Sequence, residues 1–296
     1  LPGGLALINI VSAMLMGAIA GSAMASASAM GTILGPEMEK EGYSKEFGAA
    51  VNITSSTTGL VIPPSNTLIV YSLASGGVSI AALFLAGYIP GILTGLFMMI
   101  VAMVWAKKNK YPVGKRSSLK EIFVKFIDAL PSLLLLVIVI GGIIGGIFTA
   151  TEASAVAVLY TILLSFYYKE LSTKDLPKVI LESSETTAIV MLLIGASMGM
   201  SWVLSYENIP QDISNALLSI SDNKIIILLM INVILLAVGI FMDATPAVLI
   251  FTPIFLPIVT ALGMDPTHFG IVLMLNLCIG LCTPPVGSVL FVGVGI

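Results

Sequence analysis

The chain has 296 residues, of which 57% are hydrophobic and only 10% are charged, and its mean hydropathy is +1.08. Several apolar runs approach the roughly 20 residues that a helix needs to cross a bilayer, so the composition excludes a soluble protein and predicts a polytopic helical membrane protein. The formal net charge of −3 indicates little, because in such a chain the position of the charges matters more than their sum.

Apolar segments and short polar breaks alternate along the whole chain. No charged leader or cleavage site precedes the first apolar run, so we expect no signal peptide, and the start at Leu1 suggests a longer protein. Cys278 and Cys282 lie on one apolar segment with no further Cys or His nearby, which favours small core residues. The apolar segments cover about residues 4–35, 47–75, 79–106, 129–148, 152–168, 186–206, 225–262 and 267–296.

The charges of the polar breaks predict which side of the membrane each break faces. Lys107–Phe126 contains seven Lys or Arg residues and Tyr167–Lys178 contains three, so both are predicted to be cytoplasmic. Ser205–Asn223 carries acidic residues without Lys or Arg and is predicted to lie on the opposite face. Within these breaks, Ile209–Ser221 and Ser117–Asp128 are predicted to be amphipathic helices at the membrane interface.

An internal repeat relates the two ends of the chain. The motif GLVIPP at Gly59–Pro64 recurs as GLCTPP at Gly280–Pro285, at a spacing of 221. Further matches in the same order make a chance coincidence improbable. They are Pro36 with Pro257, Gly42 with Gly263 and, after a one-residue gap, Phe47-Gly48 with Phe269-Gly270.

Each repeat opens with a long apolar stretch that small or polar residues interrupt, at Gly17–Ser28 and at Gly239–Ala247. If each stretch folds as a re-entrant hairpin, it contributes no net crossing, and five crossings separate the two hairpins. An odd number of crossings inverts one repeat relative to the other. We therefore predict an all-α fold with inverted repeats, two re-entrant hairpins and two discontinuous helices.

The predicted domains follow from this repeat. Residues 1–78 form repeat 1, with a hairpin over about 3–41 and a broken helix over about 46–75. Residues 79–223 form a scaffold with interfacial arms. Residues 224–296 form repeat 2, with a hairpin over about 225–263 and a broken helix over about 266–296.

The paired prolines explain why the broken helices matter for function. Proline interrupts a helix, and in lipid an interruption is tolerated only where it is buried in protein or lines a wet cavity. The half-helix that ends at such a break presents carbonyl groups to a cation, and the half-helix that starts after it presents N–H groups to an anion. Paired broken helices in inverted halves are typical of the binding site of a secondary transporter.

Five motifs in order, over essentially the whole chain, resemble the large membrane subunit of tripartite ATP-independent periplasmic (TRAP) transporters. They are GSAMASASAMGTILGPEMEKEGYSKEFGAAV, GLVIPPS, GGIFTATEASAVAVLY, MDATPAVLIFTPIFLPI and HFGIVLMLNLCIGLCTPPVG. The resemblance implies an elevator-type, ion-transporter-like fold in the bacterial inner membrane. It also implies sodium-coupled uptake of a carboxylate that a periplasmic binding protein delivers, a small membrane subunit as partner, and further helices before the first hairpin. The MDATPA motif is more similar to the sialic acid branch than to the C4-dicarboxylate branch.

The candidate site residues lie at the breaks and in the hairpin interruptions. Na⁺ is the predicted coupling ion, and neither another cofactor nor a transition-metal site is predicted. The predicted Na⁺ ligands are Gly59, Ile62, Pro64, Ser65, Asp243, Gly280 and Thr283. The predicted substrate-binding residues are Ser22, Ser26, Asn66, Thr245, Pro285 and Gly287.

Several of these residues have structural alternatives. Asp243 could cap the helix that begins near Pro246 instead of binding a cation, because Asp is a favourable N-cap. Ser22 and Ser26 could serve close helix packing. Glu152 and His268 each lie near a predicted helix start, where a structural role is favoured.

The distribution of basic residues constrains how a carboxylate could be held. Arg116 is the only arginine, and no lysine falls within residues 46–75 or 266–296. A carboxylate would therefore depend on helix N-termini, hydroxyl or amide groups and bound sodium ions.

Two other classes of function and one other kind of transporter fit the sequence less well. A channel would need a continuous polar lining. An enzyme is not predicted, because the sequence has neither a His/Glu metal pair nor a Ser/His/Asp constellation or nucleotide-binding glycine motif. Among transporters, the alternative is a stand-alone divalent-anion:sodium symporter that needs no binding protein.

Overall fold

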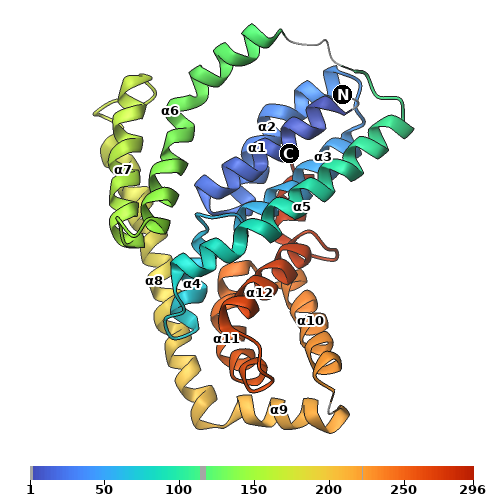
Figure 1. Ribbon diagram of the computed structural model, residues 1–296, viewed down its shortest axis with the longest axis vertical. Coiled ribbons are helices and arrows are strands. Elements are labelled where there is room, and N and C mark those ends of the chain that lie inside the picture. Colours follow the sequence, from blue (N-terminus) through green and yellow to red (C-terminus); the bar gives the residue numbers. More distant parts are fainter. Residues whose placement is uncertain (1–2, 114–117, 222) are drawn as a thin grey trace. The chain divides into compact units, whose positions relative to one another are not determined.

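The computed structural model describes residues 3–113, 118–221 and 223–296, and these residues form an all-α structure (Figure 1). The α-helices are α1 (Gly4–Ala20), α2 (Ala23–Lys40), α3 (Lys45–Ser56), α4 (Asn66–Ala74), α5 (Ile80–Lys108), α6 (Leu119–Ile144), α7 (Ala150–Tyr167), α8 (Leu176–Tyr206), α9 (Ile209–Ile220), α10 (Lys224–Phe241), α11 (Ala244–Ala261), α12 (Pro266–Leu281) and α13 (Ser288–Val294), and the 3₁₀-helix η1 covers Thr57–Leu60. Within the described ranges, six helices are long and apolar enough to cross a membrane, namely α5, α6, α7, α8, α10 and α11.

The chain divides into two compact units, one formed by Leu1–Gly114 with Gly199–Ile296 and the other by Lys115–Met198. In the second unit α6 packs against α7, and the Tyr160 hydroxyl donates a hydrogen bond of 2.7 Å to the carbonyl of Pro131. The first unit contains both predicted repeats and all the candidate site residues.

Both predicted helix interruptions are present in the first unit. The 3₁₀-helix η1 continues directly from α3 and ends at Leu60, and α4 begins at Asn66; residues 61–65 between them are called the first break. Residues 282–287, between α12 and α13, are the second break. The Pro63-Pro64 and Pro284-Pro285 peptide bonds in these breaks are cis.

The second halves of the two broken helices exchange partners. In the first unit α1 and α2 lie side by side (Figure 1), and α3 packs against both. The short helix α4 leaves this group and packs against α11 and α12, whereas α13 returns from the C-terminal group to pack against α2 and α3. Tyr71 on α4 secures one of these contacts, because its hydroxyl donates a 2.6 Å hydrogen bond to the carbonyl of Pro266.

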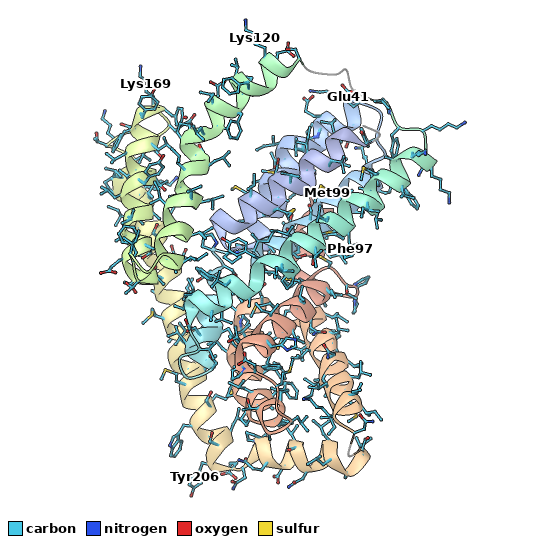
Figure 2. The ribbon with its side chains drawn as sticks, viewed as in Figure 1. Glu41, Phe97, Met99, Lys120, Lys169 and Tyr206 are labelled. Atoms are coloured by element: carbon cyan, nitrogen blue, oxygen red, sulfur yellow. The ribbon has the colours of Figure 1, made fainter. Side chains whose placement is uncertain are left out.

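Much of the apolar surface of the long helices is exposed, as lipid-facing helices require. None of the residues of α8 is buried. At its end, Trp202 and Tyr206 stack with their ring centroids 5.5 Å apart, and Figure 2 shows Tyr206 pointing outward. Phe97 on α5 is likewise exposed.

The structure corrects one predicted element and agrees with another. Ser117 lies outside the described residues, and the remainder of the predicted interfacial helix Ser117–Asp128 is the start of α6, which runs without interruption to Ile144. The predicted helix boundary after Asp128 was wrong, because charge alone does not end a helix. The predicted start agrees with the capping box of Ser118 and Glu121. The predicted amphipathic helix at Ile209–Ser221 is present as α9.

Candidate functional site

The turn between α1 and α2, called the first tip, consists of Gly21 and Ser22. Gly21 has a φ of +62°, which glycine adopts without strain. Ser22 is the N-cap of α2, and its side chain accepts a hydrogen bond of 3.3 Å from the backbone N–H of Ala25. A Cβ atom on Gly21 would lie 3.0 Å from the Cβ of Asn66, the first residue of α4. The first tip therefore touches the helix start that follows the first break.

The turn between α10 and α11, the second tip, consists of Met242 and Asp243. The Ser288 hydroxyl, at the start of α13, donates a hydrogen bond of 3.3 Å to Oδ1 of Asp243. The backbone N–H of Gly287 donates a hydrogen bond of 2.9 Å to the carbonyl of Ile240, just before this tip. The second tip thus contacts the helix start that follows the second break, as the first tip does in its own repeat.

Each repeat also contains a contact between the backbones of two glycines. A Cβ atom on Gly17 of α1 would lie 2.5 Å from the Cα of Gly59 in η1. A Cβ atom on Gly280 of α12 would lie 2.5 Å from the Cα of Gly239 in α10. Only glycine permits these approaches, so each broken helix lies against the first arm of the hairpin in its own repeat.

The two glycine contacts occupy corresponding places in the repeat. Gly59 and Gly280 are related by the spacing of the GL..PP motifs, and Gly17 and Gly239 are related by one residue more. Near the first break, the Cys278 thiol donates a 3.3 Å hydrogen bond to the carbonyl of Thr57, a residue 221 positions earlier. Positions that the repeat relates therefore meet each other where the two broken helices touch.

The predicted sodium ligands at the first break have varied surroundings. Gly59 and Ile62 are buried and Pro64 is half-buried. Ser65 is fully buried, and its hydroxyl donates a 2.6 Å hydrogen bond to the carbonyl of Leu60 on the other side of the break. Its oxygen also accepts a 3.4 Å hydrogen bond from an α4 backbone N–H. Ser65 thus holds the two half-helices together, and its oxygen retains lone-pair capacity for a cation.

At the second break, hydrogen bonds within the chain already engage part of the predicted ligand set. The carbonyl of Gly280 accepts a 2.8 Å hydrogen bond from the backbone N–H of Thr283. The Thr283 hydroxyl donates a 2.6 Å hydrogen bond to the carbonyl of Ile279. This leaves the Thr283 oxygen able to accept or coordinate, but the Gly280 carbonyl is less available than its place at a helix end suggested.

Asp243 occupies the N-cap position of α11, yet its side chain makes no capping hydrogen bond. The carboxylate is half-buried and accepts the hydrogen bond from Ser288. It forms no ion pair with any cationic group of the described residues. The structure therefore does not support the alternative that Asp243 is a side-chain cap, and it places an unneutralised carboxylate at the second tip.

The predicted substrate-binding residues do not all lie together. Ser22 and Asn66 lie together at the first tip, and Gly287 lies at the second tip. The hydroxyl of Ser26 is buried and donates a 3.3 Å hydrogen bond to the carbonyl of Ala13, so it joins the two arms of the first hairpin. Thr245 is half-buried in the first turn of α11, and Pro285 is exposed in the second break.

Two residues with structural alternatives, Glu152 and His268, lie at helix starts. Thr149 and Glu152 form a capping box at the start of α7, in which the Thr149 backbone N–H donates a 2.8 Å hydrogen bond to the Glu152 carboxylate. The backbone N–H of His268 donates to the carboxylate of Asp265, which caps α12. These hydrogen bonds agree with a structural role for both Glu152 and His268. Arg116 lies outside the described residues.

Sequence reasoning did not identify three of the residues that form these contacts, namely Gly17, Gly239 and Ser288. The first two could have been found by extending the repeat alignment beyond the motif, because they stand at almost the same spacing. Ser288 had no such signal, since the second break is one residue longer than the first. Among residues 3–113, 118–221 and 223–296, no group of three or more His, Cys, Asp or Glu residues could hold a metal ion.

Comparison with known proteins places these features in a family. The family model described as "Tripartite ATP-independent periplasmic transporter, DctM component" matches residues 1–296. The uncharacterised protein YgiK of Salmonella typhimurium is 58% identical over 100% of this chain and 68% of its own length.

Two relatives with named substrates are also similar over nearly the whole chain. The C4-dicarboxylate TRAP transporter large permease DctM of Pseudomonas aeruginosa is 41% identical over 98% of this chain and 68% of its own length. The sialic acid TRAP transporter large permease SiaM of Vibrio cholerae is 37% identical over 98% of this chain and 68% of its own length. The chain thus spans about two thirds of the length of these relatives. It belongs to the DctM family and is the large membrane subunit of a TRAP transporter, a multi-pass transport component and not an enzyme.

Proposed function

We propose that this subunit imports a carboxylate substrate across the bacterial inner membrane by sodium symport. A periplasmic binding protein delivers the substrate, and a small membrane subunit completes the transporter. The observation that carries the proposal is the paired arrangement of a hairpin tip against a helix break, which occurs once in each repeat. Membership of a tripartite family supports the two partners and removes the reason to favour a stand-alone symporter.

The proposed architecture is a pair of inverted repeats with re-entrant hairpins. The glycine contacts at Gly17–Gly59 and Gly239–Gly280 support it, because the same kind of approach recurs at corresponding positions. The hydrogen bond between Thr57 and Cys278 also supports it, since positions related by a two-fold operation meet only near the axis. The exchange of α4 and α13 between the two halves is consistent with the same symmetry.

The proposed cation sites lie at the two tips. At the second tip, the carboxylate of Asp243 has no cationic partner among the described residues, and sodium would supply the missing positive charge. Hard oxygen donors such as carboxylates, hydroxyls and carbonyls suit this ion. In the other repeat, the first break (residues 61–65) contains no carboxylate, so the proposed site there depends on the backbone around Gly59 and on the hydroxyl of Ser65.

The proposed substrate is sialic acid or a C4-dicarboxylate-like organic acid. A carboxylate substrate needs positive charge nearby, and residues 46–75 and 266–296 contain neither Lys nor Arg. Bound sodium would therefore supply this charge. The start of α4 adds backbone N–H groups that favour an anion. The named relatives carry different acids, and the MDATPA motif at the second tip is the feature that favours sialic acid.

For the substrate and sodium to reach the cytoplasm, each binding site must be exposed alternately on the two sides of the membrane. We propose an elevator movement in which both hairpins and both broken helices move together. The backbone contacts between glycines suit such a rigid body, because they leave little room for one element to slide past the other.

Uptake into proteoliposomes tests this function. The complete transporter is reconstituted with and without its binding protein, under an inward sodium gradient or with sodium replaced by choline. We expect labelled substrate to accumulate only when both the binding protein and the gradient are present. Accumulation without sodium rejects the coupling, and accumulation without the binding protein rejects the delivery mechanism.

A further inference from the structure

The first arm of the second hairpin, α10, packs along α12 within the first unit. The buried residues of α10 follow one face at helical spacing, and all of them are apolar or glycine. Leu273 and Leu277 of α12 are likewise buried. The contact between these two helices is therefore mainly apolar, and apolar packing alone resists sliding only weakly. The buried residues of α10 are Ile227, Ile231, Leu235 and Gly239.

A hydrogen bond between two amide side chains crosses this contact. The side-chain nitrogen of Asn276 on α12 donates a 2.6 Å hydrogen bond to Oδ1 of Asn232 on α10. The same nitrogen donates a 2.8 Å hydrogen bond to the carbonyl of Val272, and the nitrogen of Asn232 donates one of 2.7 Å to the carbonyl of Leu228. Each amide is thereby oriented by its own helix, so the bond between them has a fixed direction.

The amide pair and the glycine contact together define how α10 is aligned on α12. Asn232 precedes Gly239 by seven residues on one face of α10, and Asn276 precedes Gly280 by four residues on one face of α12. The two contacts therefore follow each other in the same chain direction on both helices. The glycines permit a close approach but form no directional bond, whereas the amides do. The amide pair is what fixes the register.

Both helices lead directly to the second tip and the second break. Asp243 follows the end of α10 at Phe241, and the break begins at Cys282 after the end of α12. A slip of α10 by one helical turn would move the tip by about 5.4 Å. Such a displacement exceeds the 3.3 Å hydrogen bond that joins Asp243 to Ser288. The register of α10 on α12 therefore decides whether the carboxylate reaches the start of α13.

The first repeat has a different pair at the corresponding positions. The spacings that relate the glycines of the two repeats place Ile10 opposite Asn232 and Ser55 opposite Asn276 in the alignment. Ile10 has no polar side-chain atom, and the hydroxyl of Ser55 donates a hydrogen bond to the carbonyl of Asn52 in its own helix. The amide pair thus belongs to the repeat whose tip carries the carboxylate.

We propose that Asn232 and Asn276 are positioning residues for the second cation site, because their hydrogen bond sets the register that brings Asp243 to the second break. Buried polar pairs fix register in other helical assemblies, although apolar side chains in their place can be equally stable. The inference rests on the proposed function, since it assigns these residues to the sodium site at the second tip.

Two variants remove the hydrogen bond in different ways. Asn232→Leu leaves an N–H group of Asn276 without its partner, which should lower stability. Asn232→Leu combined with Asn276→Leu replaces both amides by apolar groups of similar volume, which should restore stability. Ile231→Val is the matched control, because it removes a methyl group from the same buried face and keeps the amide pair.

Thermal unfolding of each complete purified transporter is measured in choline chloride, and uptake into proteoliposomes is measured over a range of sodium concentrations. The double-leucine variant should unfold at the wild-type temperature or above. Its half-maximal uptake should nevertheless need about threefold more sodium or higher, as loss of one interhelical hydrogen bond in a membrane protein implies. Ile231→Val should unfold at a lower temperature and keep the wild-type sodium dependence. In an Asp243→Asn background, the two leucines should shift the sodium dependence less, because the site is already impaired.

Wild-type sodium dependence in the double-leucine variant overturns the proposal. An equal shift in Ile231→Val also overturns it, because any loss of packing would then produce the effect. A double-leucine variant that fails to fold overturns it as well, since the pair would then serve stability instead of register. Sodium-independent uptake by the wild-type transporter rejects the proposed coupling and this inference together, whereas the other results reject the inference alone.

Discussion

Asp243 has an uncommon environment for a residue at the start of a helix. Its backbone adopts the extended conformation of an N-cap, but its carboxylate reaches across to Ser288 at the start of another helix. A carboxylate inside a membrane protein is costly unless it is paired or binds an ion. The side chain therefore joins the second tip to α13, and a cation bound to the carboxylate would offset the cost of its charge.

Asp243→Asn separates the charge of this side chain from its shape. Asn keeps an oxygen that can accept the hydrogen bond from Ser288, so the thermal stability of the protein without sodium should change little. Loss of the charge should raise the sodium concentration for half-maximal uptake by about tenfold or more, as expected for a charged ligand. The measurement is initial uptake in proteoliposomes over a range of sodium concentrations.

Ser288→Ala is the control for this prediction, because it removes the hydrogen bond and keeps the carboxylate. It should alter sodium dependence less than Asp243→Asn does. Unchanged sodium dependence in Asp243→Asn would show that ion binding at this tip relies on other groups.

The glycine contacts predict strong effects from a single methyl group. Gly59→Ala and Gly280→Ala each place a Cβ atom against the backbone of a neighbouring helix, which cannot move aside as a flexible side chain could. Overpacking of this kind costs about 1–3 kcal/mol. We expect a lower unfolding temperature and reduced uptake in both variants.

Gly195→Ala is the matched comparison, because a Cβ atom there meets nothing within 4 Å. Replacing this helical glycine should be neutral or should stabilise the protein by up to about 1 kcal/mol. Equal unfolding temperatures for Gly59→Ala and Gly195→Ala would contradict the close approach of α1 and η1.

At the scale of the helices, the sequence was informative where local chemistry decides the conformation. The two proline pairs predicted both breaks, and the small residues before Ser28 and Ala247 predicted the positions of both tips. The boundary predicted after Asp128 is absent from α6, because a run of charges resembles a helix end although nothing in it stops a helix. The contact of Asp243 with Ser288 was not predictable, because it depends on how two distant helices pack.

The cap of α12 gives a pH dependence whose sign follows from its hydrogen bonds. The backbone N–H of His268 and the side chain and backbone N–H of Thr267 hold the pKa of Asp265 below its ordinary value. A carboxyl group with a lowered pKa in the folded state stabilises the protein above its unfolded pKa, and this contribution is lost as the pH falls through the folded value. The stabilisation should therefore be complete near neutral pH and should disappear below about pH 4.

Thermal unfolding of wild type and Asp265→Ala as a function of pH checks this expectation. Wild type should be the more stable protein at neutral pH, and the two curves should converge under acidic conditions. A difference that stays constant down to about pH 3 would show that the charge of Asp265 is not what stabilises α12.

At the scale of the whole molecule, membrane orientation remains a prediction from charge. Single cysteines at Ser118 and Thr173 should react with a membrane-impermeant thiol reagent only from the cytoplasm, and one at Gln211 only from the periplasm. The native Cys278 is buried and Cys282 is half-buried, so a background in which both are replaced removes residual labelling. Labelling of all three sites from one side would reject the inverted orientation of the repeats.

The repeat predicted more of the molecule than any individual segment did. It located both helix breaks and the preceding glycines Gly59 and Gly280, because both copies carry the same motif. It did not predict that α4 and α13 would cross between the halves, since nothing in a linear comparison shows which copy a short helix packs against. Hydrophobic pattern fixes the presence of such a helix, and only three-dimensional packing decides its neighbours.

The exchange of α4 and α13 has a consequence for how the protein is made. The ribosome completes α4 before its packing partners α11 and α12, which emerge only after helices α5 to α10 have been translated. Until then α4 can pack against α5 and η1 but not against α11 and α12. A product truncated before α11 would therefore lack these contacts of α4, so helices translated much later complete the packing of this short helix.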